Sequence, residues 1–543
     1  MNTKIVPIGC AAICVALLCA IAIAARAATI TVTNTNDSGA GSLRQALAAN
    51  NGDTINFDPA LNGQTINLTS DELAIDKNIT ISGPGSDMLT VSTSSGTFRI
   101  FHVMPGRTVI IRGVTISGGN YSPNGPGVLN DHAVLTMDSC AVQNHFTQYN
   151  NGGGVYNDGS AGSATLTILN STVTDNYAYS AGGGIYNDAS NGGGATLSLM
   201  NSIINSNFAG HSDVPYGYGA GGGIYNDGGT LMITNSTVSN NLAGAPDPFP
   251  VGFGGGIYNY GMLTITNSTI NSNQVWLEAG GIYSGGTLTI TNSTVSGNGA
   301  TGQHDGKPWG HGGGISGAGT ITNSALSNNY ASLSGGGIEG GTTLGNTILN
   351  ANGPENIYGG ASSQGYNLSS DDGGGNLTGP GDQINTDPML GPLQDNGGPT
   401  FTHELLSGSP AIDAGDPNFT PPPFYDQRGP NFWRVRNGRI DIGSFEVQAG
   451  STPTPTPAQI NLSAVGRRVQ GRHTVNLTWS GANSADIDLF REGVVIATVP
   501  NTGSYKDFIG VRGGNVRYTY TVCEAGTQNC SNEVTVRFGG PPL

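Results

Sequence analysis

Hydrophobic and polar residues alternate in a short unit that recurs between Gly152 and Asn352. Each unit has glycines, then a run such as Thr-Leu-Thr-Ile-Thr-Asn-Ser-Thr-Val, and it ends on a second Asn. An aliphatic residue stands two positions before the first Asn, and another stands three positions after it. The first Asn is Asn170, Asn201, Asn235, Asn267, Asn292, Asn323 or Asn346, and the second is Asn176, Asn207, Asn241, Asn273, Asn298, Asn329 or Asn352. Copies lie 23 to 34 residues apart, a spacing typical of solenoid repeats.

Each unit predicts short strands rather than helix, because its apolar residues recur with period 2 and none recur with period 3.6. A unit of this size buries its apolar face only by stacking on a like neighbour. Stacking places equivalent residues about 4.8 Å apart, so the asparagines form hydrogen-bonded columns and the glycines form the corners. The sequence therefore predicts an all-β fold, a right-handed parallel β-helix with a small C-terminal β-sandwich.

The sequence predicts six consecutive parts. Residues 1–27 have the form of a secretory signal peptide, with Lys4, a long apolar run and Ala25-Arg26-Ala27 as the cleavage site. Residues 28–120 form an N-terminal cap and irregular first coils, in which Ser42 and Gln45 have capping-box spacing for a short helix over the first coil. The remaining parts are regular coils at 121–380, a Pro- and Gly-rich segment at 381–448 that closes the open end of the last coil, an extended Pro/Thr linker at 449–457, and a β-sandwich at 458–543 with Trp479 in its core.

Three of these parts resemble known families. The Gly-Gly-Gly-Ile sequence and aliphatic-x-x-Asn tetrads such as Val238–Asn241 resemble the repeats of polymorphic outer-membrane proteins, which implies a pectate-lyase-like solenoid over 28–380. Residues 384–447, with Gly408-Ser-Pro-Ala-Ile-Asp-Ala-Gly415 and Arg439-Ile-Asp-Ile-Gly-Ser-Phe-Glu446, resemble the choice-of-anchor Q domain of bacterial surface proteins. The C-terminal region resembles a fibronectin type III domain, with Tyr518-Thr-Tyr520 placed like its penultimate strand.

Charge narrows the possible partners. Removing Lys4 and Arg26 with the signal peptide leaves 18 basic and 36 acidic residues, a net charge of −18, and the acidity lies before residue 458. Such a surface excludes nucleic acid as the expected partner and favours soluble cations. Cys523 and Cys530 flank Gly526, so we expect a disulfide across the last hairpin in an oxidising compartment.

Aromatic residues recur in the loops that leave each coil at one corner. They include Tyr177, Tyr179, Tyr216, Tyr218, Trp276 and Trp309. Aromatic rings with interleaved carboxylates suit sugars, which stack through their C–H faces and form hydrogen bonds at their edges. We therefore expect a polysaccharide or cell-surface glycan as ligand. The alternative is that these rings only pack the loops onto the coils.

An enzyme is the competing hypothesis. Glu278 and Asp305 on successive loops, with His311 nearby, are the catalytic candidates for a polysaccharide hydrolase. A lyase requires Lys or Arg near the substrate, and Lys307 is the only one between Arg112 and Arg428.

Two columns of like side chains suggest a metal site and an ice-binding surface. Asp131, Asp158, Asp188 and Asp227 each follow an Asn and should stack, which predicts a possible Ca²⁺ site, although solvated turn residues explain them as well. Thr167, Thr264, Thr289 and Thr320 form a possible ice-binding array that Ser198 and Met232 interrupt.

Together these features predict a secreted, extracellular or cell-surface protein, monomeric, without a membrane span after signal cleavage and without a required cofactor. The expected role is non-catalytic adhesion or polysaccharide contact.

Overall fold

A computed structural model describes most of the chain. The described residues are 27–93, 98–120, 124–211, 218–244, 251–304, 307–448, 460–469, 472–512, 516–525 and 529–538. The predicted signal peptide, except for its last residue, and the predicted linker lie outside them.

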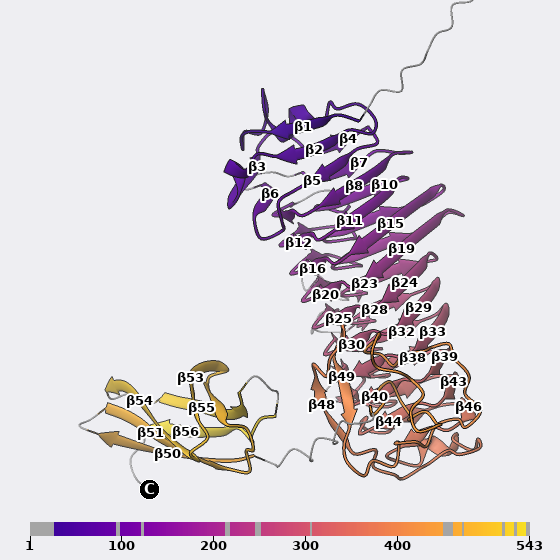
Figure 1. The fold of residues 1–543 in the computed structure, drawn as a ribbon, viewed down its shortest axis with the longest axis vertical. Coiled ribbons are helices and arrows are strands. Elements are labelled where there is room, and N and C mark those ends of the chain that lie inside the picture. Colours follow the sequence, from indigo (N-terminus) through magenta and orange to yellow (C-terminus); the bar gives the residue numbers. More distant parts are fainter. Residues whose placement is uncertain are drawn as a thin grey trace, which may run out of the picture.

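Three long parallel sheets wrap around a common core (Figure 1). The 13-stranded sheet A runs from β1 (Thr29–Val32) to β46 (Ala361–Gly365), the 12-stranded sheet B from β3 (Gln64–Leu68) to β47 (Leu368–Ser369), and the 11-stranded sheet C from β4 (Leu73–Ile75) to β45 (Ile357–Tyr358). The seven-stranded sheet D, from β13 (Phe146–Thr147) to β41 (Tyr330–Ala331), adds a fourth side to the middle coils. The predicted all-β fold, a right-handed parallel β-helix, is confirmed.

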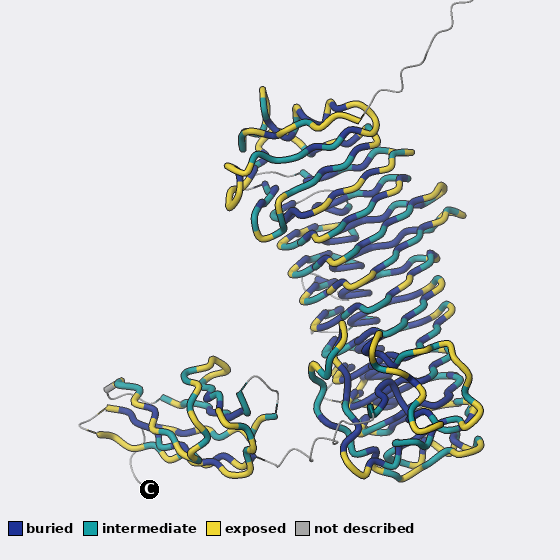
Figure 2. The backbone as a smooth tube through the Cα atoms, in the orientation of Figure 1, coloured by how far each residue is buried: buried dark blue, intermediate teal, exposed yellow. Residues whose placement is uncertain are grey.

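One coil shows how the sequence unit folds. β14 (Val155–Asp158) belongs to sheet C, β15 (Ser163–Leu169) to sheet A, β16 (Thr172–Thr174) to sheet B and β17 (Tyr177–Ala178) to sheet D. The aliphatic residues Ile168 and Val173 point inward and are fully buried. Figure 2 shows buried residues along the inside of the whole helix. Each such side chain contributes about 1.5–3 kcal/mol through burial, so the stacked columns supply the cohesion of the fold.

Asparagine ladders tie the corners together. Asn201 Nδ2 donates to Asn170 Oδ1 at 3.2 Å, and Asn235 Nδ2 donates to Asn201 Oδ1 at 3.3 Å. These residues have φ of 47–50°, a left-handed conformation that Asn tolerates. The second column is buried: Asn207 donates to Asn241 Oδ1 through both its backbone N–H and its Nδ2, each at 3.0 Å. The asparagines predicted to lie in single columns do so.

A third buried ladder was not predicted. It runs up sheet C, with Nδ2–Oδ1 distances of 2.7 Å at each of its first four steps. Its members are Asn130, Asn157, Asn187, Asn226 and Asn259. All of them except Asn259 directly precede an aspartate of the predicted column.

The two ends of the helix are closed differently. At the N-terminal end, α1 (Leu43–Ala46) buries Leu43, and Ser42 Oγ accepts from the Gln45 N–H as expected of its N-cap. At the other end, Tyr366 and Ser369 donate backbone N–H groups to the carbonyls of Pro380 and Gln383. Residues before 387 therefore close the last coil.

Residues 387–447, here called the return segment, fold back along the outside of sheet B instead of closing the end. Its hairpin of β48 (Leu390–Gln394) and β49 (Thr402–Leu405) crosses the coils in Figure 1. Thr269 Oγ1 donates to the Phe401 carbonyl at 2.7 Å, and Thr294 Oγ1 donates to Gln427 Oε1 at 2.6 Å. The predicted cap at 381–448 thus has two parts: Gln383 pairs with the last coil, and the return segment lies along sheet B.

Buried charges hold the return segment. Arg428 binds Asp426 at 2.6 Å, and its guanidinium lies between the rings of Phe432 and Phe445 at 3.9 and 3.7 Å. Arg434 is fully buried and donates to the Gly443 carbonyl. Burial, and then repulsion from Asp441, raises the pKa of Glu446 to about 9.

The C-terminal region is a sandwich of two antiparallel sheets. The first contains β50 (Asn461–Val469), β51 (Arg472–Ser480) and β54 (Ser504–Arg512). The second contains β53 (Val494–Pro500), β52 (Asp486–Arg491), β55 (Val516–Glu524) and β56 (Val534–Phe538). Trp479 lies in the core, and Cys523 is bonded to Cys530. The resemblances to a fibronectin type III domain and to the choice-of-anchor Q domain stay predictions.

No helix in the described part of the chain is both long and apolar enough to cross a membrane.

Candidate functional site

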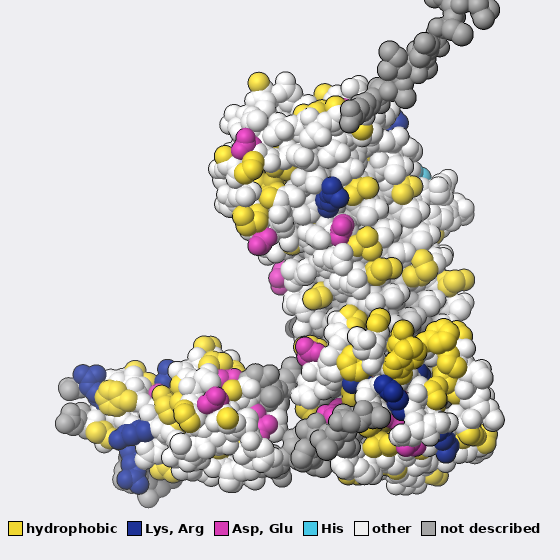
Figure 3. Space-filling model, in the orientation of Figure 1, with side chains coloured by type: hydrophobic (Ala, Val, Ile, Leu, Met, Phe, Trp, Pro, Cys, Tyr) yellow, Lys and Arg dark blue, Asp and Glu magenta, His cyan; other side chains and the backbone are white. Residues whose placement is uncertain are grey.

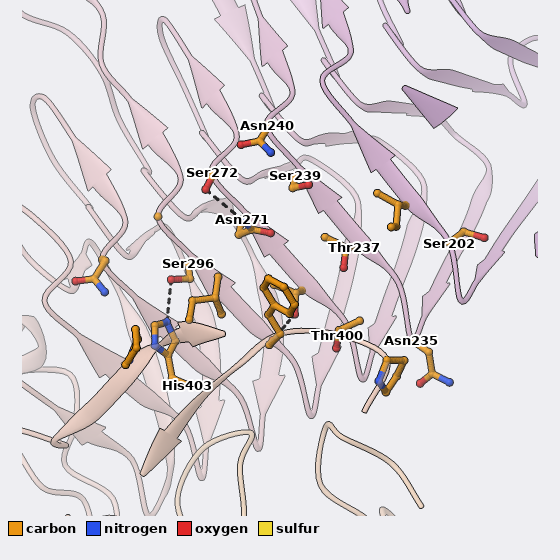
Figure 4. A pocket seen from close by; sticks show the side chains of 18 of the residues that line it. Ser202, Asn235, Thr237, Ser239, Asn240, Asn271, Ser272, Ser296, Thr400 and His403 are labelled. Carbon is orange, nitrogen blue, oxygen red and sulfur yellow. Dashed lines mark hydrogen bonds between the residues drawn. The ribbon is translucent and has the colours of Figure 1, made fainter. Parts of the chain in front are cut away.

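A groove of about 770 Å³ lies between the outer face of sheet B and the hairpin of the return segment (Figure 4). We call it the sheet-B groove. Its lining residues are Asn201, Ser202, Ile203, Asn235, Thr237, Ser239, Asn240, Thr269, Asn271, Ser272, Ser296, Gly297 and Asn328 from the coils, and Pro392, Leu393, Pro399, Thr400, Phe401 and His403 from the return segment.

The floor of the groove follows from the period-2 pattern of sheet B. Its strands are β20 (Ile203–Asn205), β25 (Thr237–Ser239), β30 (Thr269–Asn271) and β34 (Thr294–Ser296). Because the aliphatic middle residue of each strand points into the core, its two neighbours point outward. The floor therefore presents hydroxyl and amide groups in rows, such as Ser239, Asn271 and Ser296.

The lip of the groove is apolar and firmly held. Phe401 is 44% exposed although its carbonyl is fixed by Thr269, and Pro392, Leu393 and Pro399 lie beside it. His403 is buried, with Nδ1 2.8 Å from the Gly391 carbonyl and Nε2 2.9 Å from Ser296 Oγ. Burial lowers the pKa of His403, so it is neutral at neutral pH. The sequence did not predict this site because the contacts that join its two walls, such as Ser296 with His403, span more than a hundred residues.

The structure places Tyr177 and Tyr179 in two short columns of stacked rings. Tyr177 lies 4.8 Å from Phe146 and 5.2 Å from Phe208, measured between ring centroids. Tyr179 lies 5.5 Å from Tyr149 and 3.8 Å from His211. Each tyrosine thus contacts a ring on both neighbouring coils, and this favours the packing alternative for both.

Two of the other predicted aromatic residues, Trp276 and Trp309, lie in the described part of the chain. Trp276 directly follows β31 (Gln274–Val275), and its Nε1 is buried with no hydrogen-bond partner among the described residues. Trp309 is 39% exposed in the loop after β37 (Lys307–Pro308). Tyr216 lies outside the described residues, as does the side chain of Tyr218 at the start of β22 (Tyr218–Ala220).

Two of the three predicted catalytic residues meet on adjacent coils. Glu278 and His311 are in register beside sheet C, and Asp305 lies outside the described residues. Glu278 Oε1 accepts from Ser316 Oγ at 2.6 Å, and His311 Nδ1 lies 3.2 Å from Glu339 Oε2.

Glu339, which the sequence analysis did not single out, completes an edge cluster of Glu278, His311, Ser316, Ser334 and Glu339. Burial raises the pKa of Glu339, and the Glu278 carboxylate raises it further, whereas His311 and Ser334 act against this. The cluster therefore holds two carboxyl groups in different surroundings, the arrangement on which acid–base catalysis depends.

The predicted aspartate column is present, but its carboxylates have protein partners. Asp131, Asp158 and Asp188 are in register on sheet C. The hydroxyl of Tyr156 donates to Asp188 at 2.6 Å, and that of Tyr186 donates to Asp227 at 2.9 Å.

Asp131, His132 and Asp158 could each offer one ligand atom, and these atoms lie within 4.8 Å of one another. The hydrogen bond from His132 to Asp131, 2.5 Å long, raises the pKa of His132 and disfavours the neutral form that binds metal. The nitrogen ligand also fits Ca²⁺ poorly, because Ca²⁺ prefers oxygen.

The threonine column on sheet A is interrupted as expected. Thr167, Ser198, Met232, Thr264, Thr289 and Thr320 are in register, and Met232 is 41% exposed in the middle of the row.

Comparisons with known proteins give little beyond the fold. No protein family and no curated protein matches the chain. The crystal structure of pectate lyase Pel9A aligns with a TM-score of 0.42 and 14% identity, over 78% of this chain and 96% of that one. This is a distant likeness, from which neither family membership nor an activity follows.

Proposed function

We propose that this protein is a secreted or cell-surface β-helix protein that binds polysaccharide without cleaving it, and that the ligand occupies the sheet-B groove. The proposal rests on one observation: hydroxyl and amide side chains face an apolar lip across a groove of about 770 Å³. Sugars present both kinds of surface, with hydroxyls at the ring edge and C–H groups on the ring face. The volume also falls within the range of small-molecule sites, about 300–1,000 Å³.

The test is binding to a glycan array and to soluble polysaccharides with Phe401→Ala. We expect the substitution to weaken binding about tenfold, because it removes an aromatic surface that meets the sugar face. Phe424→Ala is the matched control, since Phe424 belongs to the same segment, is 57% exposed and does not line the groove. Equal binding by both variants would place the site elsewhere.

Export is part of the proposal. The signal-like residues 1–27 and the disulfide between Cys523 and Cys530 support an oxidising, extracellular location. Fractionation of producing cells, with the disulfide tested by mass spectrometry, checks this directly.

A second candidate function is polysaccharide hydrolysis at the edge cluster. It is favoured by Glu278 and Glu339, two carboxyl groups close enough for the charge of one to raise the pKa of the other. In this reading, protonated Glu339 donates to the leaving oxygen and ionised Glu278 acts as the base. A reducing-end assay over a panel of polysaccharides tests this hypothesis. Hydrolysis by the wild type that Glu339→Gln abolishes would support it, and no hydrolysis of any polysaccharide by the wild type would reject it.

A further inference from the structure

We infer that the C-terminal sandwich binds an anionic polysaccharide through the outer face of its first sheet, which β50, β51 and β54 form. We call this surface the basic face. Its residues are Arg467, Arg472 and Lys506, with Val465, Val469 and Phe508 beside them. The inference goes beyond the proposed function, because the basic face and the sheet-B groove share no residue.

Charge is unevenly distributed along the chain. Residues 458–543 hold 8 basic and 6 acidic residues, a net charge of +2. Residues 28–457 hold 10 basic and 30 acidic residues, a net charge of −20. Figure 3 shows Lys and Arg side chains gathered toward one end of the sandwich. The sandwich is therefore the part of the chain that repels an anion least.

The alternation of each strand places the three cations of the basic face on the same side of the sheet. Leu462 of β50, Leu477 of β51 and Tyr505 of β54 pack in the core of the sandwich. Side chains alternate between the two faces of a sheet, so the cation on each of these strands points away from the core. All three cations are exposed.

No carboxylate on the described part of the basic face neutralises these cations. β50 and β51 contain no Asp or Glu, and the one acidic residue of β54 is Asp507. Asp507 is buried, and its carboxylate accepts from the Tyr520 hydroxyl and from Arg491 Nη1, each at 2.7 Å. The three cations form no ion pair with a described residue. Their charge is therefore available to an external anion.

The spacing of the cations favours a polymer over a small anion. Adjacent strands lie about 4.8 Å apart and alternate residues of one strand about 6.8 Å apart, so the backbone positions of the three cations are about 8 to 14 Å from one another. One small anion cannot contact all of them. Acidic groups that repeat along a chain can, and their contacts then strengthen one another.

Apolar side chains between the cations favour a sugar polymer. Val465 is 54% exposed and Phe508 is 59% exposed. Phe508 stands two residues from Lys506 on β54 and lies in the same cross-strand row as Arg467. An acidic sugar has C–H groups on its ring faces and charged groups at its edges, so it contacts both kinds of side chain. An inorganic polyanion matches the cations alone.

The experiment measures binding of the full chain to polygalacturonate, to dextran sulfate, and to dextran as the uncharged form of the same backbone. We expect both acidic polymers to bind more tightly than dextran. Their binding should weaken about tenfold or more when the salt concentration is raised tenfold, because salt screens exposed charges. Binding of dextran sulfate no tighter than that of dextran overturns the inference. Tighter binding to DNA, anionic lipid vesicles or inorganic polyphosphate than to both acidic polysaccharides overturns it as well.

A pair of double variants ties the result to the basic face. Arg467→Gln with Lys506→Gln should weaken binding to both acidic polymers by about tenfold. Arg517→Gln with Arg537→Gln is the matched control, because these arginines are exposed, lie in register on β55 and β56, and belong to the second sheet. Equal weakening by the two pairs, or weakening by neither, overturns the inference.

Two single variants separate this surface from the sheet-B groove. Phe508→Ala should weaken binding to polygalacturonate severalfold and leave binding to polyphosphate unchanged, because polyphosphate has no C–H face. Phe401→Ala, which tests the groove, should leave binding to both acidic polymers unchanged. If Phe401→Ala removes that binding, the anionic ligand does not occupy the basic face. If the chain binds acidic polymers but no neutral polysaccharide, the proposed function fails and this inference stands.

Discussion

The coils and the return segment form the two walls of one groove, yet they are stabilised in opposite ways. In the coils the contacts of the asparagine ladders are repeated, so the Asn207–Asn241 bond has equivalents above and below it. In the return segment single contacts carry the structure, such as the pair of Asp426 and Arg428. The coils should therefore tolerate the loss of one contact that the return segment does not, although both are needed to form the site.

The largest expected effect comes from breaking the buried ion pair. Asp426→Asn leaves the Arg428 charge buried without its counter-ion, which should cost about 3 kcal/mol or more. We expect the return segment to become susceptible to protease while the coils keep their thermal transition. Asp413→Asn is the control, because Asp413 is half-buried and its carboxylate makes one 3.3 Å bond to Asn437. If both variants resist protease alike, the ion pair does not hold the segment.

The next effect comes from interrupting a buried ladder. Asn241→Ala removes the acceptor for two donors of Asn207, and unsatisfied buried donors cost about 1–3 kcal/mol each. Asn170→Gly interrupts the exposed ladder and keeps the left-handed φ of 47° accessible, so its cost should be under about 1 kcal/mol. Chemical denaturation of both variants measures the difference. Equal losses of unfolding free energy in the two variants would mean that the buried ladder stabilises the fold no more than the exposed ladder does.

A pH-dependent effect separates the two regions further. The pKa of Glu446 is raised from 4.5 to about 9, so the folded state holds a proton that the unfolded state releases. The proton on Glu446 therefore stabilises the return segment most below pH 4.5, and this contribution falls as pH rises from 4.5 toward 9. Glu446→Gln should reduce this pH dependence of stability, which proteolysis across the pH range measures. If the variant keeps the same pH dependence of stability, groups other than Glu446 cause it.

The smallest effect is expected from chelation. Tyrosine hydroxyls already donate to Asp188 and Asp227, so removing divalent cations should leave the thermal transition of the coils unchanged. A lower transition temperature with chelator, restored by Ca²⁺, would instead support the calcium site predicted from the aspartate column.

The same contrast explains how far the sequence could predict this molecule. The coils were predictable because the spacing of Asn170, Asn201 and Asn235 recurs, and repetition reveals which positions are equivalent. The position of the return segment could not be predicted, because its contacts join residues far apart in the sequence. Ser296 and His403 are 107 residues apart, and Ser268 and Gln427 are 159 residues apart. No local pattern encodes such pairings.

The same difference applies to the candidate sites: residues within the repeat could be placed from the sequence, and residues outside it could not. Glu278 and His311 could be brought together from the repeat alone, since both precede the glycines of a coil. Glu339 was missed because it replaces the Tyr of the repeat in a single copy. The sheet-B groove was missed because its lip comes from outside the repeat. Tyr216 and Asp305 stay predictions.

Hydrogen–deuterium exchange with and without a neutral oligosaccharide tests the central claim most directly. The groove predicts slower exchange in two places at once, in the floor at 201–203, 235–240, 269–272 and 296–297 and in the lip at 391–403, with the coils outside the groove unchanged. Protection confined to residues 276–311, or a floor that is protected while the lip is not, would contradict a site built from both walls.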